Sequence, residues 1–284
     1  MTISLVTDST ADVPADIVEC HRIKVVPSLV VMGGQSYRDG VDMTRDEFYR
    51  GLATFDPLPT TAAPAAGKFE AAYASMPDGP IISIHTAATL SGIYNAARLG
   101  AEPFGDRVHV IDSGSLSMGV GWEIIAAAEA IASGLTLEAV LDAVAAVRRR
   151  SLVFALLDTL ENLRRSGRIS LLRTSIAGAL QIKPLLELVN GALTPIAQHR
   201  TRNRALAEFI SHVKSFGRLE RLAVLYTDNP SIAAEVHNQL VGQCVSVPLF
   251  AQVAPTIGTH IGPGAVGVAV VKYAEQLRTE SGSI

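Results

Sequence analysis

Residues 80–97 read PIISIHTAATLSGIYNAA, and this stretch decides the fold class. The apolar run IISIH at 81–85 has the composition of a buried strand, and LSGIYNAA at 90–97 has that of a helix. A strand that leads directly into a helix is the unit from which parallel sheets are built. Ser91 and Gly92 stand at the junction, so Ser91 is a candidate nucleophile, a candidate helix N-cap and a candidate contact for an acidic ligand.

The same alternation extends over the first half of the chain. Apolar runs rich in β-branched residues recur as ISLVTD at 3–8, IKVVPSLVVM at 23–32 and VHVID at 108–112. Thr44 and Glu47 have the spacing of a capping box, which predicts that a helix begins there. We therefore expect an α/β fold whose N-terminal domain has a mostly parallel sheet flanked by helices.

The second half of the chain has a different pattern. Two helical stretches at 116–133 and 137–150 are separated by Gly134, which predicts an antiparallel helix pair. Beyond them, LELVNGALTP at 186–195 places Asn-Gly between two strand-like runs, the signature of a tight hairpin. A hairpin among helices indicates a mixed sheet. We expect an N-terminal α/β domain at 1–150 and a C-terminal α+β domain at 151–284.

Composition narrows the classes of function. The chain has 284 residues, 48% of them hydrophobic, and a net charge of −3, so it can bury a large core and has no basic surface for nucleic acid. Cys20 and Cys244 lack CxxC spacing and are expected to be buried free thiols, with no metal site. The apolar stretch at 119–134 contains two glutamates and is too short to span a bilayer. MTISLVTDST at 1–10 has neither a charged leader nor a long apolar run, so we expect no signal peptide. We expect a cytoplasmic protein with no integral membrane segment.

Nucleotide motifs are weak. GPGAVG at 262–267 fits G-x-G-x-x-G, but it precedes a predicted strand instead of following one. PAAGKF at 64–69 lacks the first glycine and the hydroxyl residue of a P-loop. No nucleotide cofactor is therefore expected.

A serine-dependent acyl hydrolase is the alternative function. It would use Ser91 as nucleophile, His260 or His85 as base, and Asp8 or Asp112 to orient the base. The nucleophile elbow requires glycine on both sides of the serine, and LSGI supplies glycine only after it. The pattern does not favour this alternative.

Five clusters of hydroxyl residues and glycines follow predicted strands or begin predicted helices. Ends of parallel strands are where open α/β sheets bind ligands, and hydroxyls with one arginine and one histidine suit a carboxylate or phosphate. The clusters are TDSTAD at 7–12, PTTAAP at 59–64, IDSGSLSMGVG at 111–121, SGRIS at 166–170 and TIGTHIGPG at 256–264.

Taken together, these motifs resemble a known family. The motifs that carry the resemblance are TDSTAD, PTT with Pro64, LSGIYNAA, IDSGSLSMGVGW, LENLRRSGRIS, IKPLLELVNGALTPIAQHRTRNRAL and IGTHIGPGAVGV. In order and spacing, from residue 6 to about 270, they resemble the DegV family of bacterial fatty-acid-binding proteins. The resemblance implies a two-domain protein that is not itself an enzyme and needs no cofactor. It implies one long-chain fatty acid, such as palmitate, in an apolar tunnel between the domains.

In related proteins, the corresponding chain is the acyl-binding subunit of a two-component fatty acid kinase. The resemblance thus implies a partner: an ATP-dependent kinase with a dihydroxyacetone-kinase-like domain, which phosphorylates the carboxyl group to an acyl phosphate. It also implies the roles of particular residues. The contacts to the carboxylate correspond to Thr61 and to Ser91 with Gly92 beside it, and Arg168 and His260 complete the polar network.

Arg200 resembles a basic surface residue that meets the kinase, and an ordinary solvated charge is the other interpretation. Two departures from the family pattern are visible. The family commonly has TTSQP where this chain has Ala62 and Ala63, so one hydroxyl and one amide are absent. The family's GGRI begins here with Ser166, which keeps the arginine.

Overall fold

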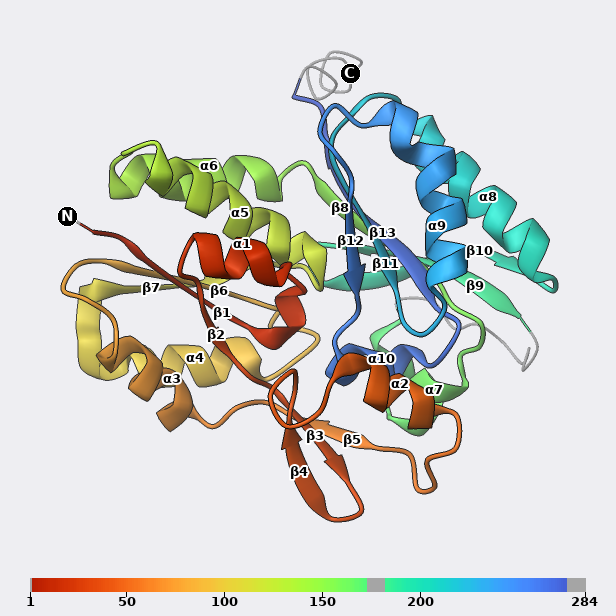
Figure 1. Ribbon diagram of the computed structural model, residues 1–284, viewed down its shortest axis with the longest axis horizontal. Helices are drawn as coiled ribbons and strands as arrows, with labels where there is room; N and C mark the ends of the chain where they lie inside the picture. The colour runs from red at the N-terminus through yellow and green to blue at the C-terminus, as the bar shows by residue number, and fades with distance from the viewer. Residues whose placement is uncertain (1, 173–181, 275–284) are drawn as a thin grey trace.

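A computed structural model describes residues 2–172 and 182–274, and the strands in these ranges form three sheets. Figure 1 shows a parallel sheet in one half of the molecule and a larger mixed sheet in the other, with a small third sheet at the lower edge. This arrangement confirms the predicted α/β fold with a parallel sheet and a later mixed sheet. Every strand of the mixed sheet follows residue 150, and the domain boundary proposed there stays a prediction.

The parallel sheet has the strand order β2-β1-β6-β7, and all its pairs are parallel. Its strands are β1 (Ser4–Asp8), β2 (Lys24–Val26), β6 (Ile81–His85) and β7 (Val108–Asp112). All residues of β1 and β6 are buried because helices cover both faces. Val6 and Ile81 pack with α3 (Ala66–Ala74) and α4 (Ile93–Ala101), whereas Leu5 and Ile82 pack with α5 (Met118–Ala132).

Helix α5 lies between the two larger sheets. Its residues Val120 and Ile124 pack in the cluster of the parallel sheet, while Met118 and Trp122 pack in a cluster with the mixed sheet. The indole N–H of Trp122 donates to the carbonyl of Ala269, 3.0 Å away. A helix buried on two sides must be apolar around most of its circumference, which explains its alanine-rich sequence. It pairs with α6 (Leu137–Arg148), as the sequence predicts.

The mixed sheet has the order β10-β9-β8-β13-β11-β12, and only the β11–β12 pair is parallel. Its strands are β8 (Ser151–Leu156), β9 (Lys183–Val189), β10 (Ala192–His199), β11 (Leu219–Tyr226), β12 (Leu249–Gln252) and β13 (Val266–Lys272). Asn190 and Gly191 both have positive φ, 49° and 72°, and form the predicted turn of the β9–β10 hairpin.

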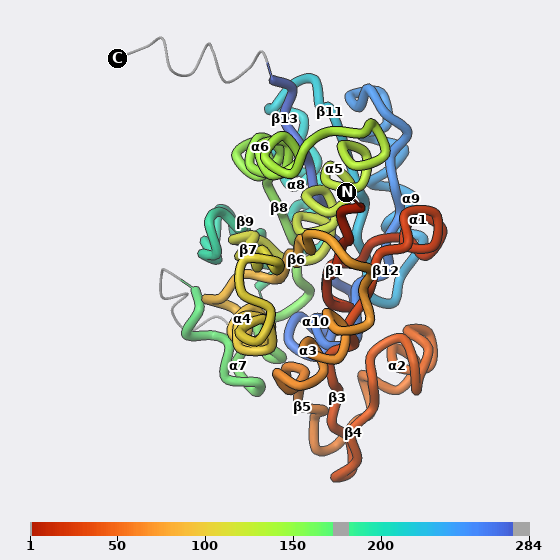
Figure 2. Tube along the Cα trace, turned by 90° about the vertical axis from the view of Figure 1, so that its left-hand side faces the viewer, coloured from red at the N-terminus to blue at the C-terminus, as the bar shows by residue number. Residues whose placement is uncertain are grey.

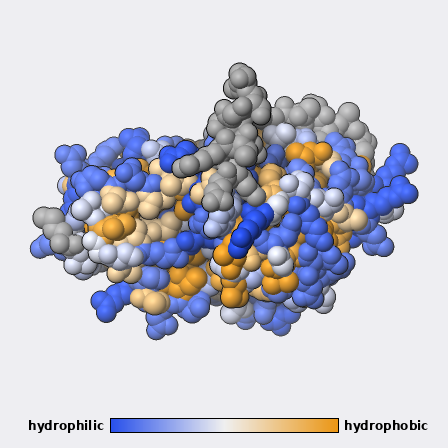
Figure 3. Space-filling model, turned by 90° about the horizontal axis from the view of Figure 1, so that it is seen from above, coloured by the Kyte–Doolittle hydropathy of each residue, from blue (hydrophilic) through white to orange (hydrophobic). Residues whose placement is uncertain are grey.

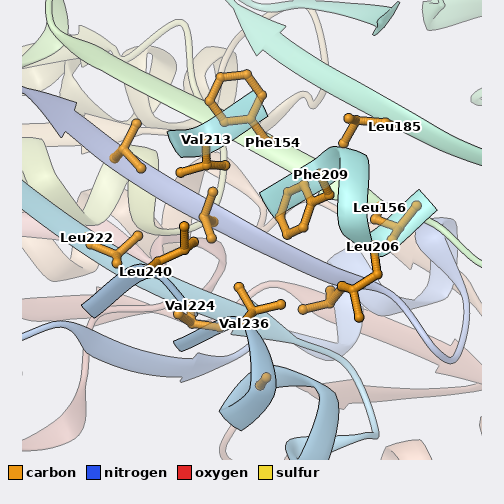
Figure 4. Close-up of a cluster of buried hydrophobic side chains, with 14 of the residues drawn as sticks. Phe154, Leu156, Leu185, Leu206, Phe209, Val213, Leu222, Val224, Val236 and Leu240 are labelled. Atoms are coloured by element: carbon orange, nitrogen blue, oxygen red, sulfur yellow. The ribbon is translucent and has the colours of Figure 1, made fainter. Parts of the chain in front are cut away.

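One face of the mixed sheet is covered by α8 (Arg202–Ser215) and α9 (Pro230–Leu240), which lie side by side in Figure 1. Figure 4 shows Phe209 and Val213 of α8 and Val236 and Leu240 of α9 among side chains of the strands. Phe154 on β8 is completely buried in this cluster. The opposite face of the sheet is turned toward α5.

The small sheet corrects one sequence interpretation. The run at 23–32 divides at Pro27 and Ser28 into β2, which joins the parallel sheet, and β3 (Leu29–Met32), which does not. Strand β3 pairs antiparallel with β4 (Gln35–Arg38) and β5 (Thr60–Ala62). Proline has no N–H for a ladder, so the strand breaks at Pro27 and the chain turns away. The small sheet places Thr61 within hydrogen-bonding distance of His260.

Short helices connect the two halves of the molecule. They are α1 (Ala15–Cys20), α2 (Arg45–Leu52), α7 (Glu161–Arg165) and α10 (Pro255–Ile261), with 3-10 turns at Ser9–Ala11, Glu102–Arg107, Ile169–Leu171 and Val241–Gln243. Helix α2 begins at the predicted capping box of Thr44 and Glu47. Helix α10 contacts α2, α7, β3 and β5, and Figure 2 shows it close to β3 from a second direction.

The surface is of mixed polarity. Figure 3 shows hydrophilic and hydrophobic residues interspersed over the face seen from above. Cys20 is exposed and Cys244 is half-buried, so the expectation of two buried thiols is wrong; α1, which ends at Cys20, has no buried residue. In the described ranges, no helix combines the length and apolar character that crossing a membrane requires.

Candidate ligand-binding site

A cavity of about 150 Å³ lies where the two halves meet, and we call it the polar cavity. It is bounded by the ends of β1 and β6, the start of α4, strand β5 and helices α7 and α10. Eight of its wall residues have polar side chains: Thr10, Ser28, Thr61, Thr86, Ser91, Arg168, Thr256 and His260. The remaining walls include leucines and isoleucines, so the polar groups occupy an otherwise apolar space.

A second cavity of about 80 Å³, the apolar cavity, adjoins the first. The two share the walls Leu116, Leu163, Leu193, Ile257 and Ile261. Its other walls come mainly from the mixed sheet, on the side that is turned toward α5. They include Val153, Leu186, Leu188 and Leu225, all buried. A polar chamber that opens beside a buried apolar one suits an amphiphilic ligand.

The structure brings the five sequence-predicted ligand residues together. Thr61, Ser91, Gly92, Arg168 and His260 all line the polar cavity. Their direct contact with a ligand stays a prediction.

Thr61 and His260 form one polar pair in this cavity. The Thr61 Oγ1 atom lies 2.9 Å from His260 Nε2, and this contact joins β5 to α10. The other ring nitrogen, Nδ1, is buried and has no hydrogen-bond partner within residues 2–172 and 182–274. Burial, and secondarily the nearby Arg168 cation, lower the pKa of His260 to about 4. The imidazole is therefore neutral at neutral pH. With its proton on Nε2, it leaves the Thr61 hydroxyl free to donate into the cavity.

Ser91 is placed to donate in the same way. Its Oγ atom accepts a weak hydrogen bond from the Ile93 N–H at 3.4 Å, and within the described residues the hydroxyl proton has no acceptor. The N-cap residue of α4 is Gly92, one position later, so the interpretation of Ser91 as N-cap is wrong. A serine just before a helix start can direct both its hydroxyl and nearby N–H groups toward an anion.

The geometry does not favour a hydrolase centred on Ser91. His260 bonds Thr61 rather than Ser91, and no carboxylate among residues 2–172 and 182–274 orients its Nδ1 atom. Asp112 instead accepts from the backbone N–H groups of Ala88 and Gly114.

A serine–histidine–aspartate array does exist elsewhere. Ser83 Oγ lies 2.7 Å from His85 Nε2, and His85 Nδ1 lies 2.9 Å from Asp8 Oδ2. All three residues are at most 1% exposed, and neither Ser83 nor His85 lines any of the three cavities we describe. Ser83 Oγ also contacts the Tyr73 hydroxyl at 2.9 Å. No substrate can reach this serine, so the array is a structural network of the parallel sheet.

Other sequence signals have simpler outcomes. Arg200 is exposed in the loop after β10 and lines none of these three cavities. GPGAVG leads into β13, which begins at Val266, and Gly262 and Gly264 have positive φ in the turn before it. No cluster of His, Cys, Asp or Glu that could hold a metal ion occurs in the described part of the chain.

Four polar wall residues were not identified in advance. Thr10 and Thr256 belong to hydroxyl clusters that the sequence singles out, TDSTAD and TIGTHIGPG, but no individual role was assigned to them. Thr86 directly follows β6, at the carboxyl end of a parallel strand, and this position could have identified it. Ser28 lies within an apolar run, and no sequence signal distinguishes it.

Comparisons with known proteins agree with this geometry. The family model described as "Uncharacterised protein, DegV family" matches residues 2–273. A DegV domain-containing protein of Mycobacterium tuberculosis is 35% identical over 274 residues, covering 95% of this chain and 97% of the relative. A solved structure of a DegV family protein from Thermus thermophilus, described by its fatty acid binding, superposes with a TM-score of 0.86 at 30% identity, over 96% of this chain and 100% of the other.

A stearic acid-binding protein from Eubacterium ventriosum superposes with a TM-score of 0.84 at 25% identity, over 97% of this chain and 99% of the other. Both solved structures therefore share the fold along nearly the whole chain. Since the family match also extends over almost every residue, the chain belongs to the DegV family.

Proposed function

We propose that this protein binds one long-chain fatty acid, with the carboxylate in the polar cavity and the hydrocarbon tail in the apolar cavity. The observation that carries the proposal is the shared wall between a chamber with uncommitted hydroxyls and a buried chamber of leucine, isoleucine and valine side chains. The descriptions of the Thermus and Eubacterium relatives as fatty-acid-binding proteins support it. The ligand would then lie between the proposed domains.

The tail would supply most of the affinity. Burying a methylene contributes about 0.8 kcal/mol, so a palmitoyl tail contributes roughly 10 kcal/mol before the costs of ordering and association. The shared walls include Leu116, Leu163 and Leu193, whose side chains can change rotamer to admit a chain.

Hydrogen-bond donors with a small desolvation cost would hold the head group. A carboxylate taken out of water requires hydrogen bonds, and hydroxyls supply them without burying another charge. Ser91 and Thr61 would donate, because the neutral His260 can leave the Thr61 proton free. Arg168 lines the same cavity and favours the anionic form of the ligand.

We further propose that the protein presents the carboxyl group to an ATP-dependent kinase, which converts it to an acyl phosphate. Support comes from the position of the polar cavity. Ala62 and Gly92, two of its wall residues, are exposed, so this end of the site lies at the molecular surface. In this proposal the chain supplies no catalytic group, Arg200 contacts the partner, and the pair works in the cytoplasm, where ATP is available.

Native mass spectrometry of protein purified from a bacterial host tests the binding function. We expect a mass increment of one long-chain fatty acid per chain, confirmed by organic extraction and chromatography. Ser91→Ala should retain less fatty acid. The melting temperature of its delipidated form should equal that of delipidated wild type, because the hydroxyl supports the ligand and not the fold.

Ser215→Ala is the matched control, since Ser215 is exposed at the end of α8. A fully folded wild-type protein that is empty, and that takes up no palmitate when it is added, would refute the proposal.

A further inference from the structure

The polar cavity has a second set of hydroxyl groups that the contacts proposed above do not use. Thr10, Ser28, Thr86 and Thr256 come from the turn after β1, the β2–β3 connection, the end of β6 and helix α10. We call these four residues the hydroxyl wall. All four are at most 5% exposed, so water does not satisfy them freely.

Three of the four hydroxyl protons already have acceptors. The Thr10 hydroxyl donates to Asp8 Oδ1, and the Thr256 hydroxyl donates to Asp39 Oδ2 at 3.0 Å. Thr86 Oγ1 lies 2.6 Å from Thr10 Oγ1. Since the Thr10 proton points to Asp8, Thr86 must be the donor in this contact. Thr10, Thr86 and Thr256 therefore offer only lone pairs to the cavity.

Ser28 differs from the other three. Its side-chain oxygen is buried and has no hydrogen-bond partner in the described ranges 2–172 and 182–274. The residue is 1% exposed. Its proton is thus the one on the hydroxyl wall that remains available to a bound molecule.

The backbone around Ser28 is held firmly. Its N–H donates to Ser9 Oγ at 3.1 Å, and its carbonyl accepts from the Asp39 N–H at 2.9 Å. Ser9 in turn donates to Asp39 Oδ2 at 3.1 Å. These bonds fix the position of the side chain without using its hydroxyl, which is the arrangement of a preorganised binding group.

We propose that the Ser28 hydroxyl donates a hydrogen bond to one oxygen of the bound fatty acid carboxylate, and so makes the site selective for a two-oxygen head group over an alcohol. This inference rests on the proposed fatty acid function and adds a donor to it. A carboxylate accepts along several directions from two oxygens, whereas an alcohol has a single oxygen. One oxygen of the acid would face Ser91 and Thr61, and the other would face Ser28.

The same proposal explains why an unpaired buried hydroxyl persists. An unsatisfied hydroxyl destabilises the empty protein, and a ligand oxygen that pairs with it removes this cost on binding. Replacing Ser28 by alanine should therefore have opposite effects on the empty protein and on the complex. A residue with a purely structural role would weaken both.

The test compares wild type, Ser28→Ala, Ser28→Cys and the exposed-site control Ser215→Ala in delipidated form. For Ser28→Ala we expect a melting temperature of the empty protein equal to or above that of wild type. The Kd for palmitate should rise by roughly 10- to 150-fold, the effect of losing a hydrogen bond to a charged group. The Kd for hexadecanol should change by less than about threefold, and Ser28→Cys, with a weaker donor of similar size, should be intermediate for palmitate.

A spectroscopic signal completes the test. In carbon NMR of bound palmitate labelled at the carboxyl carbon, Ser28→Ala should raise the pKa of the bound carboxyl group, because a hydrogen bond to the charged form is lost. Equal Kd values for palmitate in wild type and Ser28→Ala, or equal losses for palmitate and hexadecanol, would overturn the role of Ser28 while leaving fatty acid binding intact. A wild-type protein that binds no palmitate would instead overturn the function and this role together.

Discussion

Replacing His260 by glutamine should change how stability depends on pH. In the folded protein, burial and Arg168 lower the pKa of this imidazole to about 4, from an ordinary value of 6.5. Between these pH values the unfolded chain binds a proton that the folded chain does not. The contribution of His260 to stability is therefore complete above pH 6.5 and is lost as the pH falls toward 4. At about 1.4 kcal/mol per pKa unit, the loss amounts to about 3 kcal/mol.

Other buried groups act in the opposite direction over part of this range. Burial raises the pKa of Asp12 to about 6 and that of Glu123 to about 7. Each binds a proton more readily in the folded chain than in the unfolded chain, so its contribution to stability falls as the pH rises through these values. Neither shift has His260 among its causes, so both effects cancel when the variant is compared with wild type.

The assay is urea unfolding of the delipidated proteins at pH 7 and pH 4. Between these pH values, the free energy of unfolding of His260→Gln should fall by about 3 kcal/mol less than that of wild type. Thr61→Val is the control, because it removes the partner of His260 Nε2 but leaves the burial and Arg168 that cause the shift. It should keep the wild-type pH dependence. The same pH dependence in wild type and His260→Gln would refute the assignment of a neutral, buried imidazole.

Three further predictions concern stability and partner binding. At pH 9, where Glu123 is ionised, Arg148→Ala leaves this buried carboxylate without the cation whose Nη2 lies 2.6 Å from Glu123 Oε2, and it should cost roughly 3 kcal/mol in chemical unfolding. A loss below about 0.5 kcal/mol would contradict this expectation. Gly191→Ala should lower the free energy of unfolding by about 1–2 kcal/mol, because the residue has a φ of 72° and a Cβ there would lie 2.5 Å from Thr89 Oγ1. An unchanged melting temperature would contradict this expectation. Arg200→Glu should leave the Kd for palmitate unchanged, but it should lower the rate of acyl phosphate formation by the purified partner kinase about tenfold or more. Equal rates of acyl phosphate formation in the variant and wild type would show that Arg200 does not contact the kinase.

Much of the fold could be predicted because local signals agree with tertiary structure. IISIH and VHVID became adjacent parallel strands, and the Asn190–Gly191 turn became a hairpin, since each pattern satisfies both local geometry and burial. The alternation predicts that the run at 23–32 joins the parallel sheet, but only β2 does, because composition alone does not reveal a change of sheet. Pro27 interrupts the strand, and β3 then pairs with β4 and β5 in the small sheet.

The family resemblance selected residues that the structure brings together, although their contact with a ligand stays a prediction. Thr61, Ser91 and His260 stand in motifs and converge on one cavity. Ser28 could not be found this way, because its significance depends on which neighbouring hydroxyl protons are already bonded. That information exists only once Thr10 and Asp8 are placed in space.

A crystal structure with 16-bromohexadecanoic acid would test the central claim most directly. The account predicts a single anomalous bromine peak in the apolar cavity, near Leu186, Leu188 and Leu225, with carboxylate density in the polar cavity beside Ser91 and Thr61. A bromine peak on the protein surface, or a ligand whose carboxylate lies in the apolar cavity, would contradict it.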